Sequence, residues 1–404
     1  MSDFVRQVKQ LEKPLALQLG RLDMELTERC NNRCIHCYIN QPEEDLALKA
    51  RETSTAFVKD VLKQAAELGC LSVRYTGGEP LLREDFEELY LFARRLGLKV
   101  AISTNACLIT PDLARLFARI TPGWPLAVSV YGMHARSYDA VTGVSGAFEQ
   151  FWQGVNLLRE HKVPFGVKQS LLPQNRNELL EFEAFASTLP AMEKKPSYTM
   201  SFDLRTRRDD EKKNRHIRRL RISPEETLDM ITREPEKYVK KMRQFAAKFM
   251  IPPGDKIFSC GAGKGVSIDA YGNAQMCLLL RHPHTVYPLD RALHRQRHPE
   301  SKLQPLEYAL NEFFPRMREL CSSNPQYMER CALCFLKSLC DQCPARSWEE
   351  CGTLDTPVEY LCQVAHAKAV YLGLLQEGEY SWKLTPELWQ ARIETFLKRP
   401  ANLT

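Results

Sequence analysis

The sequence lacks the features of a membrane, secreted or repeat protein. No window approaches the roughly 18 consecutive apolar residues of a membrane-spanning helix, and the opening MSDFVRQVKQ has no apolar secretory core. The sequence also has no fixed-period repeat and no low-complexity segment. With 404 residues, 44% of them hydrophobic, the chain has the composition of a globular protein of one to three domains. We therefore expect a cytoplasmic protein that does not bind membranes.

A large excess of charge of one sign is missing too. The 56 Lys and Arg residues against 50 Asp and Glu residues leave a net charge of +6. No nucleic-acid-binding motif accompanies this excess, so we expect no nucleic-acid partner. Much of the excess lies in one run, residues 205–221. This run is interpreted either as a solvated basic helix or as a dock for an acidic peptide.

Cysteine, by contrast, is abundant. Fourteen cysteines are too few per residue for a small disulfide scaffold and many for an intracellular enzyme. In a reducing compartment such cysteines bind metal or take part in chemistry. Nine of them lie between Cys260 and Cys362, and five lie before residue 110. Two regions with different cysteine usage imply two kinds of site.

The first half of the chain has a repeating βα pattern. Between residues 18 and 205 short apolar runs alternate with longer amphipathic stretches, which indicates a parallel sheet. Six successive units suit either an open doubly wound sheet or a partial barrel. The expected strands are 17–26, 71–76, 99–104, 126–130, 164–171 and 198–204. The expected helices are 53–68, 83–96, 111–120, 135–141, 147–161 and 176–188.

The βα rhythm ends before Pro252-Pro253-Gly254, a turn sequence that suits a domain boundary. The expected organisation is an N-terminal extension (1–17), a barrel (18–205), a charged helical bridge (206–255), a cysteine-rich domain (256–380) and a helical tail (381–404).

Three cysteines follow the first expected strand with the spacing C-x3-C-x2-C: Cys30, Cys34 and Cys37. Three thiolates in one loop can surround a single inorganic centre, and barrel folds place chemistry at the carboxyl ends of their strands. A structural zinc ion would need a fourth ligand. A [4Fe–4S] cluster on three cysteines would leave one iron open to a substrate or cosubstrate.

The second expected strand ends in Gly77-Gly78-Glu79-Pro80. Two glycines allow the backbone to come close to a ligand, and a carboxylate beside them can accept hydrogen bonds from a cationic amine. Taken alone, this sequence also suits an ordinary turn between a strand and a helix.

The two motifs together resemble those of the radical S-adenosylmethionine (SAM) enzymes. The resemblance implies a partial (β/α)6 barrel of the TIM type, a [4Fe–4S] cluster on the three cysteines, and SAM bound at the open iron. Reductive cleavage of SAM would give a 5′-deoxyadenosyl radical that abstracts hydrogen from substrate. A reductase, or an electron donor of the flavodoxin or ferredoxin type, would supply the electron.

The resemblance also implies which residues contact SAM. They lie in the cysteine loop and at strand ends: Tyr38, Gly77, Gly78, Glu79, Pro80, Ser103, Asn105, Ser129 and Lys168. Lys168 equally suits a barrel lysine that reaches solvent. Asp203 and Arg205, at the end of the sixth expected strand, are the candidate catalytic residues, which would bind substrate or take a proton.

The downstream cysteines are spaced Cys260-x11-Gly272-x4-Cys277, then C-x2-C-x5-C-x2-C from Cys331 to Cys343, then Cys362. Gly272 is predicted to lie in a hairpin turn. The array exceeds the two C-x2-C pairs of a zinc ribbon. It resembles a SPASM domain, the C-terminal module that carries auxiliary iron–sulfur clusters in radical SAM enzymes that modify peptides and proteins. It departs from the SPASM pattern before Cys343, where two residues stand instead of three.

This resemblance implies two auxiliary clusters, expected to be of the [4Fe–4S] type. The outer cluster would be held by Cys331, Cys334, Cys340 and Cys362. The inner cluster would be held by Cys260, Cys277 and Cys343, with Cys321 as the favoured fourth ligand and Cys351 or a substrate as alternatives. Cys70 and Cys107 are interpreted as buried thiols outside the clusters.

The predicted function is the maturation of a ribosomally made peptide, by cross-linking or another oxidation at an unactivated C–H bond. No peptide-recognition domain of usual size is expected before the Cys30 loop, so leader binding would need a separate protein or the basic run. Two alternatives remain open. One is maturation of a protein residue to formylglycine, or of a tetrapyrrole. The other is a zinc-ribbon binding protein whose cysteines are structural.

Overall fold

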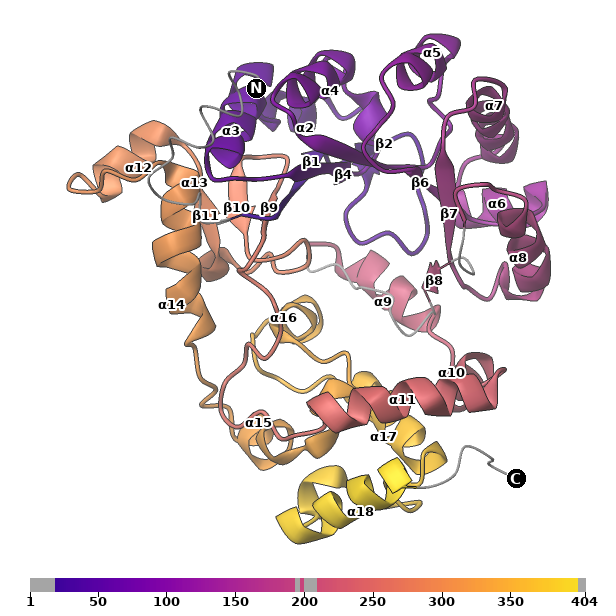
Figure 1. Ribbon diagram of the computed structural model, residues 1–404, viewed down its shortest axis with the longest axis vertical. Helices are drawn as coiled ribbons and strands as arrows, with labels where there is room; N and C mark the ends of the chain where they lie inside the picture. Colours follow the sequence, from indigo (N-terminus) through magenta and orange to yellow (C-terminus); the bar gives the residue numbers. More distant parts are fainter. Residues whose placement is uncertain (1–18, 193–196, 200–208, 399–404) are drawn as a thin grey trace, which may run out of the picture.

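A computed structural model gives the fold and describes residues 19–192, 197–199 and 209–398. Within these residues a nine-stranded sheet has the order β11-β10-β9-β1-β4-β5-β6-β7-β8 (Figure 1). Strands β1, β4, β5, β6, β7 and β8 pair in parallel. Their bounds are β1 Arg21–Thr27, β4 Ser72–Gly77, β5 Lys99–Thr104, β6 Leu126–Val130, β7 Phe165–Ser170 and β8 Ser197–Thr199. The predicted α/β fold with a parallel sheet is confirmed.

Helices follow the parallel strands, as the βα pattern predicts. They are α3 Thr55–Glu67, α4 Phe86–Arg95, α5 Pro111–Arg119, α6 Ala135–Thr142, α7 Ala147–Glu160 and α8 Leu179–Ser187. Helix α5 begins where the sequence indicates: the Thr110 hydroxyl accepts from the Leu113 amide, and Pro111 occupies the first turn. The last expected strand, 198–204, is described only as far as Thr199.

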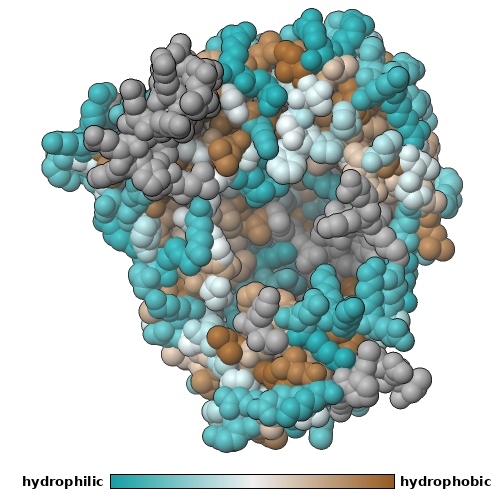
Figure 2. Space-filling model, in the orientation of Figure 1, coloured by the Kyte–Doolittle hydropathy of each residue, from teal (hydrophilic) through white to brown (hydrophobic). Residues whose placement is uncertain are grey.

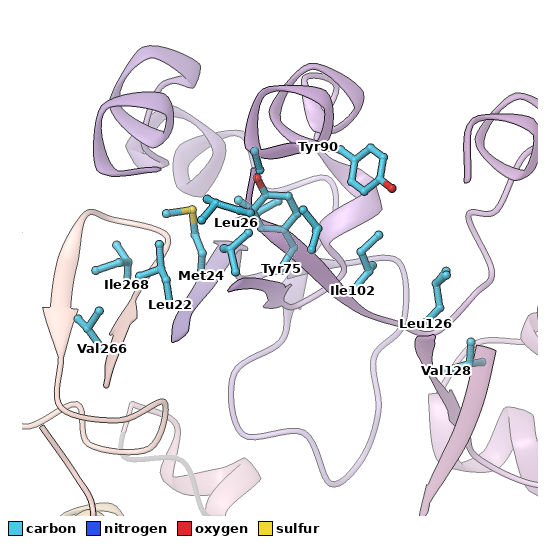
Figure 3. Packing of buried hydrophobic residues seen from close by; sticks show 14 of the residues in the cluster. Leu22, Met24, Leu26, Tyr75, Tyr90, Ile102, Leu126, Val128, Val266 and Ile268 are labelled. Carbon is cyan, nitrogen blue, oxygen red and sulfur yellow. The ribbon is translucent and has the colours of Figure 1, made fainter. Parts of the chain in front are cut away.

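Buried and half-buried side chains alternate along the strands, so the two faces of the sheet differ in their surroundings. In β4 and β5 the side chains of Val73, Tyr75, Val100 and Ile102 are buried. They form part of a hydrophobic layer between the strands and the helices that cover them (Figure 3). Each fully buried aliphatic side chain contributes about 1.5–3 kcal/mol to folding. The residues between them, such as Ser103, are half-buried on the opposite face, which is left for polar groups.

The C-terminal part of the chain extends the same sheet. Strand β9 (Val266–Ile268) pairs in parallel with β1 and antiparallel with β10 (Asn273–Gln275), and β11 (Val286–Pro288) pairs with β10. The hairpin expected at Gly272 is present, and Gly272 has a φ of +86°, which favours glycine. The sheet therefore continues past the domain boundary that the sequence suggests.

The remaining elements lie mostly on the other side of the molecule from the barrel helices. The helices are α2 Leu46–Arg51, α9 Glu211–Arg219, α10 Pro224–Ile231, α11 Pro235–Phe249, α12 Arg291–Arg297, α13 Pro305–Tyr308, α14 Phe314–Arg318, α15 Pro325–Glu329, α16 Pro344–Cys351, α17 Glu359–Tyr371 and α18 Pro386–Lys398. The short strands β2 (Arg29–Cys30) and β3 (Gln41–Pro42) pair with each other.

A second hydrophobic core joins the expected bridge and tail to the cysteine-rich region. It includes Val239 of α11, Phe335, Leu372 and Phe396 of α18. Figure 2 shows one face of the molecule hollowed between the barrel and this C-terminal part. In the described part of the chain, every helix is too short or too polar to span a membrane.

Candidate active site and cysteine groups

The loop that carries Cys30, Cys34 and Cys37 follows β1 and is anchored at the end of α6. The amides of Arg33 and Ile35 donate to the carbonyl oxygens of Thr142 (2.8 Å) and Val141 (3.0 Å). Within the loop, the Cys37 amide donates to the Cys34 carbonyl oxygen at 3.2 Å. Cys30 and Cys34 are buried and Cys37 is half-buried. The loop therefore has a defined conformation set by packing against a neighbouring βα unit.

Gly77, the last residue of β4, and Gly78 directly after it bring the backbone of this strand against the segment that leads to Cys30. A Cβ on Gly77 would lie 2.1 Å from the Thr27 carbonyl oxygen, and one on Gly78 would lie 2.2 Å from that of Arg29. The Gly78 amide donates to Thr27 at 2.7 Å, and the Glu79 amide donates to Arg29 at 3.0 Å. The sequence suggested close approach to a ligand; the close approach in the structure is to the chain's own backbone.

Glu79 is buried at this junction, with 1% of its surface exposed. Its carboxylate accepts from the Thr104 hydroxyl (2.9 Å), the Asn105 amide (2.8 Å) and the Leu81 amide (3.2 Å). Burial raises its pKa to about 7, although these hydrogen bonds and the charge of Lys168 lower it. A carboxylate held in this way in a desolvated position is suited to a cationic amine.

Asn105 connects this carboxylate to the cysteine loop. Its side-chain amide donates to Asn31 Oδ1 at 2.8 Å and lies 3.8 Å from Cys30 Sγ. Ser103 and Ser129 are half-buried on the polar face of the sheet. Lys168 is exposed and stands opposite Ser129 in register.

The other predicted SAM contacts lie at the same edge. Tyr38 is half-buried directly after Cys37, and Pro80 is buried at the start of a 3-10 turn. The two candidate catalytic residues, Asp203 and Arg205, lie outside the described residues. The roles assigned to all these residues stay predictions.

Three residues near this site were not singled out from the sequence. Thr104 donates to Glu79, Asn31 accepts from Asn105, and both amide atoms of the buried Asn32 have no partner within the described residues. Because Asn31 and Asn32 lie inside the cysteine motif, the sequence could have identified both as candidate site residues. Beside the loop lies a hollow of about 1060 Å³, lined in part by Asn32, Asn40 and Lys213.

The donor chemistry of the loop fits an iron–sulfur cluster. All three thiols are free, and burial raises the pKa of Cys30 and Cys34. The charges of Cys34 and Cys37 raise the pKa of Cys30 further, so the three sulfurs are electrostatic neighbours. A bound metal would offset this cost by replacing the thiol protons. Across the described ranges, no three His, Cys, Asp or Glu side chains converge as ligands of a single metal ion.

Four C-terminal cysteines line one hollow of about 380 Å³, and they are the four assigned to the outer cluster: Cys331, Cys334, Cys340 and Cys362. Burial raises the pKa of Cys331 and Cys340 to about 12 and that of Cys362 to about 11. The structure thus gathers cysteines separated by up to 31 residues around a single space, as a cluster-binding site requires.

The cysteines assigned to the inner cluster are also neighbours. Burial raises the pKa of Cys277, and the charges of Cys343 and Cys260 raise it further. Cys321, the favoured fourth ligand, is exposed, and its charged neighbours are Asp255, Lys256 and Glu319.

The remaining cysteines differ in their surroundings. Cys351 is exposed at the end of α16. Cys70 is buried and donates to the Ser72 carbonyl oxygen, whereas Cys107 is half-buried and its charge acts on Cys34.

The basic run serves internal contacts in its described part. Arg221 forms a buried ion pair with Glu350 at 2.6 Å, and Arg218 pairs with Glu211 at 2.7 Å. Lys213 donates to Asn40 at the edge of the cysteine loop. Residues 205–208 lie outside the described residues.

Comparison with known proteins identifies the barrel. The profile of the radical SAM superfamily matches residues 24–186. The AdoMet-dependent heme synthase of Methanosarcina barkeri is 31% identical over 187 residues, which are 46% of this chain and 51% of that protein. The mycofactocin maturase MftC of Mycolicibacterium smegmatis is 32% identical over 183 residues, 45% of each chain. The chain thus spans about half the length of these curated relatives.

The fold also resembles that of solved structures over most of the chain. The structure entitled "Native anSMEcpe with bound AdoMet" has a TM-score of 0.56 and 13% identity, covering 93% of this chain and 100% of the other. Streptococcus suis SuiB bound to the precursor peptide SuiA has a TM-score of 0.55 and 16% identity, covering 89% and 79%. The matched profile, which includes the cysteine motif, shows that residues 24–186 form a radical SAM domain, and the solved structures show that the chain as a whole has a similar fold.

Proposed function

We propose that this protein is a peptide maturase that cleaves SAM reductively and oxidises a ribosomally made peptide by forming a cross-link. The observation that carries the proposal is the convergence of the cysteine loop, Glu79 and the polar strand ends at one edge of the parallel sheet. When bound on Cys30, Cys34 and Cys37, a [4Fe–4S] cluster would supply the electron that converts SAM to methionine and a 5′-deoxyadenosyl radical.

The chain's own residues would bind and orient SAM. Glu79 accepts the amino group, because its carboxylate is desolvated and already fixed by three donors. Asn105 holds the cysteine loop at a constant distance from this carboxylate through Asn31. Lys168 and Ser129, adjacent in register, offer a cation and a hydroxyl to the carboxylate and ribose of SAM.

Two comparisons support a peptide as the substrate. A solved neighbour of similar fold has a precursor peptide bound, and a relative of the barrel is named a maturase. The hollow beside the cysteine loop, with Arg33 and Asp210 in its lining, offers groups of both signs to a peptide. The outer and inner cysteine groups are proposed to hold auxiliary [4Fe–4S] clusters, which would take up the electron that oxidation releases.

A second candidate is a tetrapyrrole-modifying enzyme. The observation that favours it is the 31% identity to an AdoMet-dependent heme synthase over the barrel. The two candidates share the radical-forming site and differ in the substrate that reaches it and in the bond that is oxidised.

Cluster content is tested by anaerobic purification and metal analysis. We expect a brown protein with about twelve irons per chain, from three clusters of four. A variant with Cys30, Cys34 and Cys37 replaced by alanine should lose about four irons and all SAM cleavage. The matched control is Cys70→Ala, a buried cysteine outside the three groups, which should keep both. A colourless protein that contains zinc would contradict the proposal.

The substrate is tested by mass spectrometry after anaerobic incubation with SAM and a reductant. A short peptide encoded beside this protein should lose two hydrogens, and fragmentation should locate the new cross-link. Decarboxylation of a porphyrin propionate, with the peptide unchanged, would instead support the tetrapyrrole candidate.

A further inference from the structure

The outer cysteine group is surrounded by side-chain donors directed at its sulfurs. Ser381 Oγ lies 2.8 Å from Cys334 Sγ, and Arg330 Nη2 lies 3.5 Å from Cys362 Sγ. A thiolate carries no proton, so the Ser381 hydroxyl must donate when Cys334 binds a metal. These donors come from different segments of the chain, so tertiary packing places them here.

Arg330 is held in place by contacts on two sides. Its Nη2 also donates to Glu359 at 2.8 Å, and its guanidinium lies 4.7 Å from the ring centroid of Trp382. Its Nε–H is buried and has no acceptor within the part of the chain that the structure describes. A buried N–H without an acceptor destabilises the folded protein. Arg330 lines the hollow, where the sulfur atoms of a cluster would provide the missing acceptor.

His366 adds a neutral donor to the same site. Its Nε2 accepts from the Ser381 amide at 3.2 Å, so the ring proton sits on Nδ1. That Nδ1–H donates to the Cys362 carbonyl oxygen at 2.8 Å and lies 3.6 Å from Cys362 Sγ. His366 therefore links the backbone at Ser381 to a ligand of the proposed cluster.

The charges around the hollow are mainly positive. Arg330 and Lys337 both line it, and Lys337 acts electrostatically on Cys331, Cys334 and Cys340. Glu359, paired with Arg330, is the acidic group that opposes them. Reduction adds negative charge to a cluster, and nearby cations and hydrogen bonds to sulfur stabilise the reduced form.

We propose that Arg330, Ser381 and His366 raise the reduction potential of the outer auxiliary cluster and thereby favour electron transfer to it. The inference rests on the proposed function, because it requires a cluster on Cys331, Cys334, Cys340 and Cys362. It adds to that function an electronic role for three positioning residues that bind neither SAM nor substrate.

The test is a redox titration of the anaerobically reconstituted holoenzyme, followed by electron paramagnetic resonance. Arg330→Gln and Ser381→Ala should shift the midpoint potential of the outer cluster to more negative values. Arg330→Lys, which keeps the charge, should restore part of the shift. Glu359→Gln removes a negative charge and should move the potential in the opposite direction. Repeating the titration in the Cys30, Cys34 and Cys37 alanine background removes the signal of the radical-forming cluster.

The control is a variant that loses a positive charge far from the outer cysteine group. Arg291→Gln removes one cation from an ion pair with Asp60 on the barrel and should leave the potential unchanged. The inference is overturned if Arg330→Gln and Ser381→Ala, each with full iron content, keep the wild-type potential. It is also overturned if Glu359→Gln shifts the potential in the same direction as Arg330→Gln. If Cys340→Ala loses no iron, the cluster assignment in the proposed function fails instead.

Discussion

At the residue scale, Glu79 shows what burial does to a site carboxylate. Three donors fix its position, yet burial still raises its pKa to about 7 from 4.5. The folded protein without SAM therefore binds a proton at Glu79 more tightly than the unfolded chain does. This proton makes its full contribution to the free energy of unfolding below about pH 4.5, and the contribution is lost as the pH rises through about 7.

We predict that Glu79→Gln makes the stability of the SAM-free protein less dependent on pH. Glutamine stays neutral, so the variant should avoid a loss of up to about 3 kcal/mol between pH 5 and pH 8. Thermal unfolding measured at both pH values gives the comparison. The exposed Glu160→Gln is the control and should behave as wild type. Parallel pH dependence of Glu79→Gln and wild type would contradict the prediction.

At the element scale, the end of β4 fixes the distance between the Gly77–Pro80 turn and the cysteine loop. Gly77 has a φ of +125°, and both glycines lie against the backbone between Thr27 and Arg29. A side chain at either position must push β4 away from the strand that leads to Cys30. The Gly-Gly pair is therefore a packing requirement of the site.

We predict that Gly78→Ala lowers both stability and cluster content. Its Cβ would overlap a backbone oxygen, and overpacking of this kind costs about 1–3 kcal/mol or more. The displaced loop should bind less iron at Cys30, Cys34 and Cys37, which metal analysis and SAM cleavage would detect. Gly261→Ala, with no atom within 4 Å of its Cβ, should keep both properties. Equal iron content in the two variants would refute the packing argument.

At the scale of the whole molecule, Arg281 ties the C-terminal region to the barrel. Its Nη2 contacts both carboxylate oxygens of Glu25 in β1 at 2.7 and 2.6 Å, and its Nη1 contacts Glu28 at 2.6 Å. The Tyr271 hydroxyl also donates to Glu28 at 2.8 Å. With the pairing of β1 and β9, this network makes the two regions parts of one structure.

We predict that Arg281→Leu destabilises the protein by about 3–5 kcal/mol, because Glu25 is left buried without its counter-ion. The double variant Glu25→Gln with Arg281→Leu should recover most of this loss, since the buried charge at Glu25 is removed together with its counter-ion. Chemical unfolding of the two variants and of Glu25→Gln alone measures the coupling. A double variant no more stable than Arg281→Leu would show that the pair is not the cause.

Local patterns predicted much of the fold. Strands β5 and β6 begin and end where the sequence indicates, because alternating burial and β-branched residues are local properties. Helix α8 was expected from residue 176 and begins at Leu179, after a 3-10 turn over Arg176–Glu178. Helix ends depend on such caps and turns, which a periodic pattern resolves less sharply.

The candidate site was predicted less completely. The cysteine spacing and the Gly-Gly-Glu-Pro turn are readable because each lies in one short segment. Thr142 and Val141 illustrate the limit: their carbonyl oxygens hold the cysteine loop, a role visible only once α6 packs beside it. In the sequence the same segment is an ordinary helix end.

The sequence by itself determined the βα order, the hairpin at Gly272 and the spacing of the cysteines, since these follow from local conformation and ligand chemistry. Tertiary structure decided which distant groups meet. Arg281 reaches Glu25 across 256 positions, and Ser381 reaches Cys334 across 47. Such contacts depend on chain topology and desolvation, because a buried charge or thiolate is stable only where folding brings a partner to it.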